Sequence, residues 1–117
     1  MRFLTIYKSP ETGAPPTPEE IERMGAFIQE MADSGHLELT DGLLPSSKGV
    51  RVRRDNGKFT VIDGPFTEAK EVVGGFAIMN FDSLQEAVEA TKRFLEVAGD
   101  GESEVREMYP QPAYARA

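Results

Sequence analysis

The chain has 117 residues and a net charge of −7, with 39% hydrophobic and 28% charged residues, which is typical of one ordinary globular domain. The acidic balance argues against nucleic acid and acidic membranes as partners, because both attract a positive field. The lack of cysteine excludes disulfides and thiolate chemistry, and without a signal-like or membrane-length apolar run we expect a cytoplasmic protein that is not bound to a membrane.

The first part of the chain predicts one strand and one helix. Residues 3–7, "FLTIY", form a β-prone apolar run that is typical of a buried strand. A helix is predicted over 18–34, with Thr17 as its N-cap and Glu20 completing a capping box. Apolar residues recur within it at three- and four-residue spacing, which gives it one apolar face. Gly35 suits the left-handed conformation that ends many helices.

The next part of the chain is irregular and then predicts a hairpin. Residues 36–49 mix leucines with turn residues and are expected to hold a short strand at 37–39. Asn56-Gly57 strongly favours a type I′ turn, because both central residues of that turn need positive φ. With this pair at the tip, one face of the hairpin is predicted to be buried, and Asp63 lies at the end of that face. The apolar residues of the face are Val50, Val52, Phe59 and Val61.

The last part of the chain predicts a strand, a helix and a weaker strand. Residues 72–81 are almost continuously apolar, as in a strand buried on both faces, and Gly74-Gly75 indicates a bulge or a close backbone approach. A helix is predicted from the capping box of Ser83 and Glu86 to Gly99. Residues 102–109 are expected to form a final strand. We therefore predict a single domain over 1–109 and a flexible tail over 110–117.

This order predicts an α+β fold of the ferredoxin-like type, a βαββαβ sandwich with one extra insertion before the hairpin. Its antiparallel sheet carries both helices on one face. Nothing in the chain is then left to cover the other face, although the central strand is strongly apolar. We predict a homodimer through the open sheet face, joined sheet to sheet.

The run Asp63-Gly64-Pro65-Phe66 has two interpretations. Asp-Gly-Pro is good turn chemistry, so the run can be purely structural. Alternatively, Asp63 is half-buried at a strand end and acts as a base or binds a polar ligand. The candidate ligand-binding residues are Asp63, Arg51, Lys70, Glu71 and Phe66; in the competing interpretation the charged ones among them are solvated surface residues.

His36 is the only histidine and the second candidate catalytic residue, after Asp63. Its competing interpretation is a helix C-terminal residue that favours the helix dipole. With no second histidine and no ligand spacing, we expect no metal site. Gly74-Gly75 lies within a strand rather than ahead of a helix, so no phosphate-binding loop is predicted, and we expect no cofactor.

Residues 2–108 resemble the DGPF-domain proteins, a branch of the YCII-related family. The run "DGPF-x-E-x-KE" carries most of the resemblance, together with "VRVR" before the hairpin turn and "GGF" after it; its residues are Asp63, Gly64, Pro65, Phe66, Glu68, Lys70 and Glu71. The resemblance implies a ferredoxin-like subunit and a dimeric α/β barrel. It also implies a His/Asp pair with the histidine inside the first helix, and this chain has no histidine there.

Two functions follow as hypotheses. The first is a small-molecule-binding dimer with an acid/base site near the DGPF turn, which leaves open whether the protein is an enzyme. The second is a regulatory or protein-interaction module without chemistry. The resemblance implies a link of this second kind to sigma-factor signalling, since many DGPF proteins are encoded near sigma factors.

Overall fold

The computed structural model describes residues 1–110, and within them the chain forms an α+β fold. The elements follow in the order β1 (Arg2–Ser9), α1 (Pro18–Asp33), β2 (Leu37–Gly42), the 3-10 turn η1 (Ser46–Lys48), β3 (Val50–Asp55), β4 (Lys58–Asp63), β5 (Val72–Asn80), α2 (Leu84–Ala98) and β6 (Glu102–Glu107). The predicted tail lies, apart from Pro110, outside the described residues. Neither helix is long and apolar enough to cross a membrane within this part of the chain.

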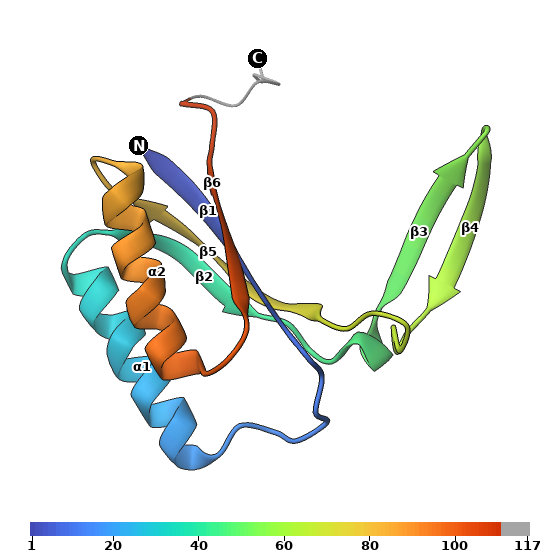
Figure 1. The fold of residues 1–117 in the computed structure, drawn as a ribbon, viewed down its shortest axis with the longest axis horizontal. Coiled ribbons are helices and arrows are strands. Elements are labelled where there is room, and N and C mark those ends of the chain that lie inside the picture. The colour runs from blue at the N-terminus through green and yellow to red at the C-terminus, as the bar shows by residue number, and fades with distance from the viewer. Residues whose placement is uncertain (111–117) are drawn as a thin grey trace.

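The main sheet is antiparallel and has the strand order β2-β5-β1-β6. Figure 1 shows α1 and α2 together on one side of this sheet. The predicted ferredoxin-like class with both helices on one face is therefore confirmed. The expected bulge is also present, because the pairing of β1 with β5 shifts by one residue at Gly74, between the partners of Tyr7 and Lys8.

Local sequence signals place the ends of both helices as predicted. The Thr17 hydroxyl accepts a hydrogen bond from the Glu20 amide at 3.1 Å, and the Ser83 hydroxyl accepts one from the Glu86 amide at 3.2 Å. These bonds satisfy amides that have no partner inside the helix. After α1, Gly35 adopts φ 81°, a left-handed conformation that glycine takes without a steric penalty.

The core lies between the helices and the sheet. Phe3 of β1 is fully buried, and its neighbours in the core are Met31, Met79, Phe81, Ala87 and Ala90. The residues of β1 that alternate with Phe3 point to the opposite face. That face carries the apolar side chains of Leu4, Ile6, Leu39, Phe76 and Ile78, which we call the open sheet face.

The hairpin departs from the prediction in its location. Its register is the predicted one, from Val50 opposite Asp63 to Asp55 opposite Lys58, and Asn56 and Gly57 both have positive φ. However, β3 and β4 form a two-stranded sheet of their own. Figure 1 shows this hairpin, residues 50–63, standing apart on the side of the main sheet away from the helices. We call it the hairpin arm.

Two expectations about the hairpin are therefore wrong for the single chain. The face predicted to be buried is exposed, with 66% of Val52 and 70% of Phe59 accessible to solvent. Asp63, predicted to be half-buried, is exposed as well. The physical reason is that β2, predicted only as a short strand at 37–39, extends to Gly42 and pairs with β5 at the edge of the main sheet, whereas β3 and β4 pair with each other alone.

Candidate functional site

The DGPF turn, residues 63–66, joins the hairpin arm to the domain. The Gly64 amide donates to the Gly49 carbonyl at 2.9 Å, and the Phe66 amide donates to the Ser46 hydroxyl at 3.0 Å. The peptide bond between Gly64 and Pro65 is cis. Both ends of the turn are thus held against the η1 segment that precedes the arm.

Ser46 also connects this turn to the loop after β1. Its amide donates to one carboxylate oxygen of Glu11 at 2.6 Å, and its hydroxyl donates to the other at 2.5 Å. The hydroxyl bond, followed by the amide bond, holds the pKa of the Glu11 carboxyl below its ordinary value. The Ser46 hydroxyl therefore donates to Glu11 and accepts from Phe66, which links three separate segments of the chain.

Gly64 lies too close to η1 for any side chain. A Cβ atom built on it would stand 1.7 Å from the Ser46 carbonyl oxygen and 2.6 Å from the Ser46 carbonyl carbon. Both neighbours are backbone atoms, which cannot rotate away as the end of a side chain can. Glycine is required here for close approach between two backbone segments.

Arg51 completes the base of the arm. Its guanidinium carbon lies 3.9 Å from the centre of the Phe66 ring, and its Nη1 lies 2.5 Å from Oε1 of Glu68. A hydrogen bond from its own backbone amide, and then the bond from Arg51, lower the pKa of the Glu68 carboxyl. The guanidinium is thereby fixed between an aromatic ring and a carboxylate.

The structure brings together only some of the residues predicted for the site. Arg51 and Phe66 are in contact, and Asp63 begins the turn that ends at Phe66. Lys70 and Glu71 are exposed beyond the turn. No hydrogen bond or ion pair within residues 1–110 joins Asp63, Lys70 or Glu71 to Arg51.

His36 lies in a different part of the molecule. It immediately precedes β2, whereas the segment that contacts the DGPF turn follows β2, so the two places are at opposite ends of that strand. The His36 Nδ1 atom lies 2.9 Å from the Asn80 carbonyl oxygen, and its ring stacks on Phe81 with 4.5 Å between centroids. A groove of about 430 Å³ runs beside it, between the helices, and is bordered by Glu30, Ser34, Gln85, Glu86, Glu89 and Arg93.

The sequence did not predict a cavity of about 320 Å³ between the helices and the sheet, which we call the core cavity. Most of its lining is apolar, from Met24, Phe27, Ile28, Met31, Leu37 and Phe94. The sheet contributes small residues at the same place, Gly75 and Ala77 of β5, which leave the space unfilled. The small residues in an otherwise bulky apolar strand are the signal that could have indicated it.

The hydroxyl groups around the core cavity already have protein acceptors. Thr40 donates to the Phe76 carbonyl and Thr91 donates to the Ala87 carbonyl, each at 2.8 Å. Tyr7 donates to the Asp100 carbonyl at 3.2 Å. Asp41 is the one charged residue among the described residues that line the cavity, but its pairing with Phe76 places its carboxylate on the open sheet face, so the lining offers hydroxyl acceptors and no charge. The cavity is therefore suited to an apolar body that is neutral or cationic.

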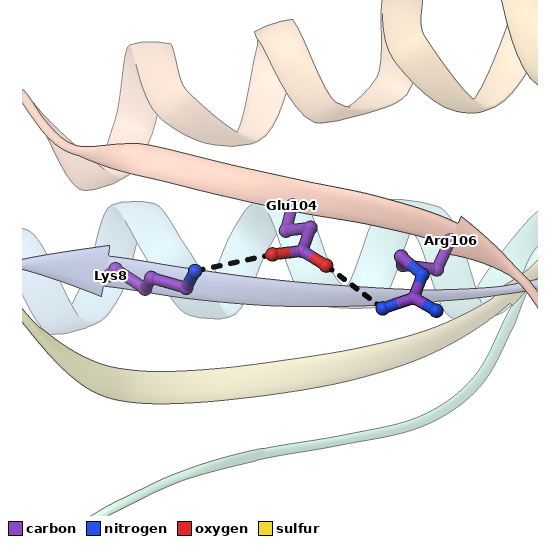
Figure 2. Close-up of polar contacts among 3 residues, drawn as sticks. All are labelled: Lys8, Glu104 and Arg106. Atoms are coloured by element: carbon purple, nitrogen blue, oxygen red, sulfur yellow. Dashed lines mark hydrogen bonds and ion pairs between the residues drawn. The ribbon is translucent and has the colours of Figure 1, made fainter.

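A charged row borders the open sheet face at the β1–β6 edge. Figure 2 shows Glu104 between Lys8 and Arg106, with one carboxylate oxygen 3.2 Å from Lys8 Nζ and the other 3.2 Å from Arg106 Nη1. Register places these three side chains on the same face as Leu4 and Ile6. The hydrogen bond from Lys8, followed by that from Arg106, lowers the pKa of the Glu104 carboxyl.

Comparison with known proteins identifies the family of the chain. The family model for the YCII-related domain matches residues 1–110. A curated relative, "Uncharacterized protein R00369" of Rhizobium meliloti (strain 1021), is 33% identical in an alignment 75 residues long that covers 61% of this chain and 60% of that protein. The match thus spans less than two thirds of the relative. With its sheet order, its helices and a family match over every described residue, the chain belongs to the YCII-related domain family.

Proposed function

We propose that this YCII-related protein binds a small molecule with an apolar body in the core cavity. The observation that carries the proposal is the cavity itself, whose volume of about 320 Å³ falls in the range of small-ligand pockets. Met24, Phe27 and Ile28 at its lining are only partly buried, so a ligand can reach the cavity from solvent. An unfilled space of this size, walled by both helices and three strands, favours a ligand-binding role.

The lining supports a choice of ligand class. The threonine and tyrosine hydroxyls donate to backbone carbonyls, so what they still offer a ligand is acceptor lone pairs. Hydroxyl oxygens that can only accept, together with the overall charge of −7, disfavour an anionic ligand. The expected ligand is a small neutral or cationic molecule with an aromatic or aliphatic body.

The test uses indole as a neutral probe and follows the unfolding temperature of the whole chain. Ligand that binds only the folded state raises this temperature in a saturable way. Ala77→Leu fills part of the cavity and should weaken indole binding by about tenfold or more. Ala32→Leu makes the same change on the exposed side of α1 and should leave the binding constant within about threefold. Absence of any saturable shift with indole or its cationic analogue tryptamine would contradict the proposal.

We further propose that the protein acts as a homodimer. The support is the open sheet face, where five apolar side chains lie on the side of the sheet without helices. A contiguous apolar surface of this kind is unfavourable in water and is commonly covered by another protein surface. Light scattering on the purified chain measures the mass directly, and a stable monomer at all concentrations would contradict this part of the proposal.

A second candidate function is a polar-ligand or acid/base site at the DGPF turn. It is favoured by one observation, the guanidinium of Arg51 fixed on Phe66 in the turn that the exposed Asp63 begins; register places the Asp63 carboxylate on the other face of the arm from Arg51. Asp63→Asn should abolish binding of a polar metabolite there, whereas Asp55→Asn near the arm tip should not. The regulatory alternative, an interaction module, is favoured only by the exposed apolar face of the arm. If Asp63→Asn and Asp55→Asn bind the polar metabolite equally well, the interaction module is the better explanation of the DGPF turn.

A further inference from the structure

The hairpin arm presents an apolar face that its own chain leaves uncovered. Val50, Val52, Phe59 and Val61 share that face by register and are between 54% and 70% exposed. A two-stranded hairpin alone in water is at best marginally stable. An arm that keeps four large apolar side chains in solvent therefore needs a covering surface.

The arm is fixed at its base rather than free to fold back. The bonds from Gly64 to Gly49 and from Phe66 to Ser46 hold both of its strand ends. The stacking of Arg51 on Phe66 adds a third contact at the same place. These contacts direct the arm away from the domain, as Figure 1 shows. A surface presented in a fixed orientation loses little conformational freedom when it binds.

The charge of the arm indicates what covers it. Of the chain's 13 Lys and Arg and 20 Asp and Glu residues, residues 50–63 hold four cations and two anions, a net charge of +2. The rest of the chain holds nine cations and eighteen anions, a net charge of −9. A second copy of the chain is thus, outside its own arm, a body of opposite net charge to the arm, which steers the two copies toward each other over a distance.

The same chain also supplies an apolar surface of matching kind. The open sheet face carries Leu4, Ile6, Leu39, Phe76 and Ile78, and Leu39 is 51% exposed. In a two-fold dimer, a contact from surface i to surface j is repeated from j to i. Two apolar surfaces in one chain, the arm and the open sheet face, can therefore cover each other twice in a pair of copies.

We infer that the hairpin arm of each subunit packs its apolar face against the open sheet face of a second copy, so that the two subunits exchange arms. This inference rests on the proposed homodimer and goes beyond it, because it assigns the DGPF turn a specific task. The turn holds the arm in the orientation that reaches the partner. The small-molecule proposal for the core cavity does not depend on it.

Two neighbouring residues of β4 provide a matched test. Val61 lies on the apolar face of the arm, whereas Thr60 lies on the opposite face, paired with Arg53, and both are exposed. Val61→Asp should raise the dimer dissociation constant by about tenfold or more, and Thr60→Asp by less than about threefold. Light scattering over a dilution series measures both, and circular dichroism checks that each variant is folded. Two variants that dimerise like the unaltered chain would overturn the exchange of arms and leave the homodimer standing, whereas an unaltered chain that stays monomeric would overturn both.

A second measurement reports on the arm directly. The chain has no tryptophan, so Phe59→Trp introduces a single fluorophore at a position that is 70% exposed in one subunit. Its emission should shift to the blue over the concentration range in which the dimer forms. An unshifted emission in a proven dimer would show that the sheets pair without the arm. A blue emission that is already present in the monomer would show that the arm folds onto its own chain, and either result overturns the inference.

Discussion

Substituting Gly64 by alanine should lower the free energy of unfolding through one identifiable contact. The new Cβ atom would stand 1.7 Å from the Ser46 carbonyl oxygen, a separation that real Cβ atoms essentially never show. The turn must therefore move away from η1. Since η1 and the turn are joined by the bonds from Gly64 to Gly49 and from Phe66 to Ser46, this movement lengthens or breaks both.

The magnitude follows from those two terms. Each lost hydrogen bond costs about 1 kcal/mol net, and forcing atoms into occupied space costs about 1–3 kcal/mol where the structure relaxes. With both bonds lost, we expect the free energy of unfolding of Gly64→Ala to fall by about 3–5 kcal/mol. With a urea dependence of about 2 kcal/mol per molar, the midpoint should decrease by about 1.5–2.5 M.

Gly25→Ala is the matched control, because the same methyl group is added where nothing lies within 4 Å. Gly25 is inside α1, and alanine in a helix interior is more favourable than glycine by about 0.5–1 kcal/mol. The two variants should therefore shift the urea midpoint in opposite directions. Far-ultraviolet circular dichroism at one protein concentration measures both midpoints. A Gly64→Ala midpoint equal to that of the unaltered chain would refute the close approach and, with it, the anchoring role given to the DGPF turn.

The remaining predictions concern the core and the charged row. Phe3→Ala removes a fully buried ring and should lower the free energy of unfolding by about 3–5 kcal/mol in urea, whereas Ile21→Ala, at a side chain 58% exposed on α1, should change it by about 0.5 kcal/mol or less; similar losses for the two would contradict the location of the core. The pKa of Glu104 is lowered below its ordinary value of 4.5, so its contribution to stability is complete above that pH and is lost as the pH falls through its folded-state value. Glu104→Gln should accordingly reduce the loss of stability between about pH 5 and about pH 3. Lys8→Met should reduce this loss too, because Lys8 is the largest cause of the lowered Glu104 pKa. An acid unfolding curve that is unchanged in both variants would contradict the role of this ion pair.

The sequence by itself determined the features that depend on near neighbours. Thr17 and Ser83 place the helix starts because a capping hydroxyl bonds an amide only three residues away. Asn56-Gly57 determines the hairpin register because the two-residue turn needs positive φ at both positions. With the turn fixed there, the pairing of the two strands cannot slip. The DGPF motif indicated the family, and the family match over residues 1–110 confirms it.

The tertiary structure decided which strands share a sheet. Alternation of apolar and polar residues in the hairpin is the same whether the apolar face is covered by its own domain or stands free, so the pattern could not distinguish the two. The pairing of Leu37–Gly42 with β5 joins residues more than 30 positions apart and is decided by packing rather than by local preference. For this reason β2, whose sequence signal is weak, is part of the main sheet, whereas the β3–β4 hairpin, whose sequence signal is strong, lies outside it.

The candidate sites depend on the same kind of distant contact. Ser46 donates a hydrogen bond to Glu11, 35 residues away in the chain, and accepts one from Phe66 of the DGPF turn. These contacts show that the turn anchors the arm to the domain. The core cavity arises because Gly75 and Ala77 face the helices at a place where no larger side chain reaches across. The sequence supplied each of these residues, but the space between them and the contacts among them exist only once segments far apart in the chain have packed together.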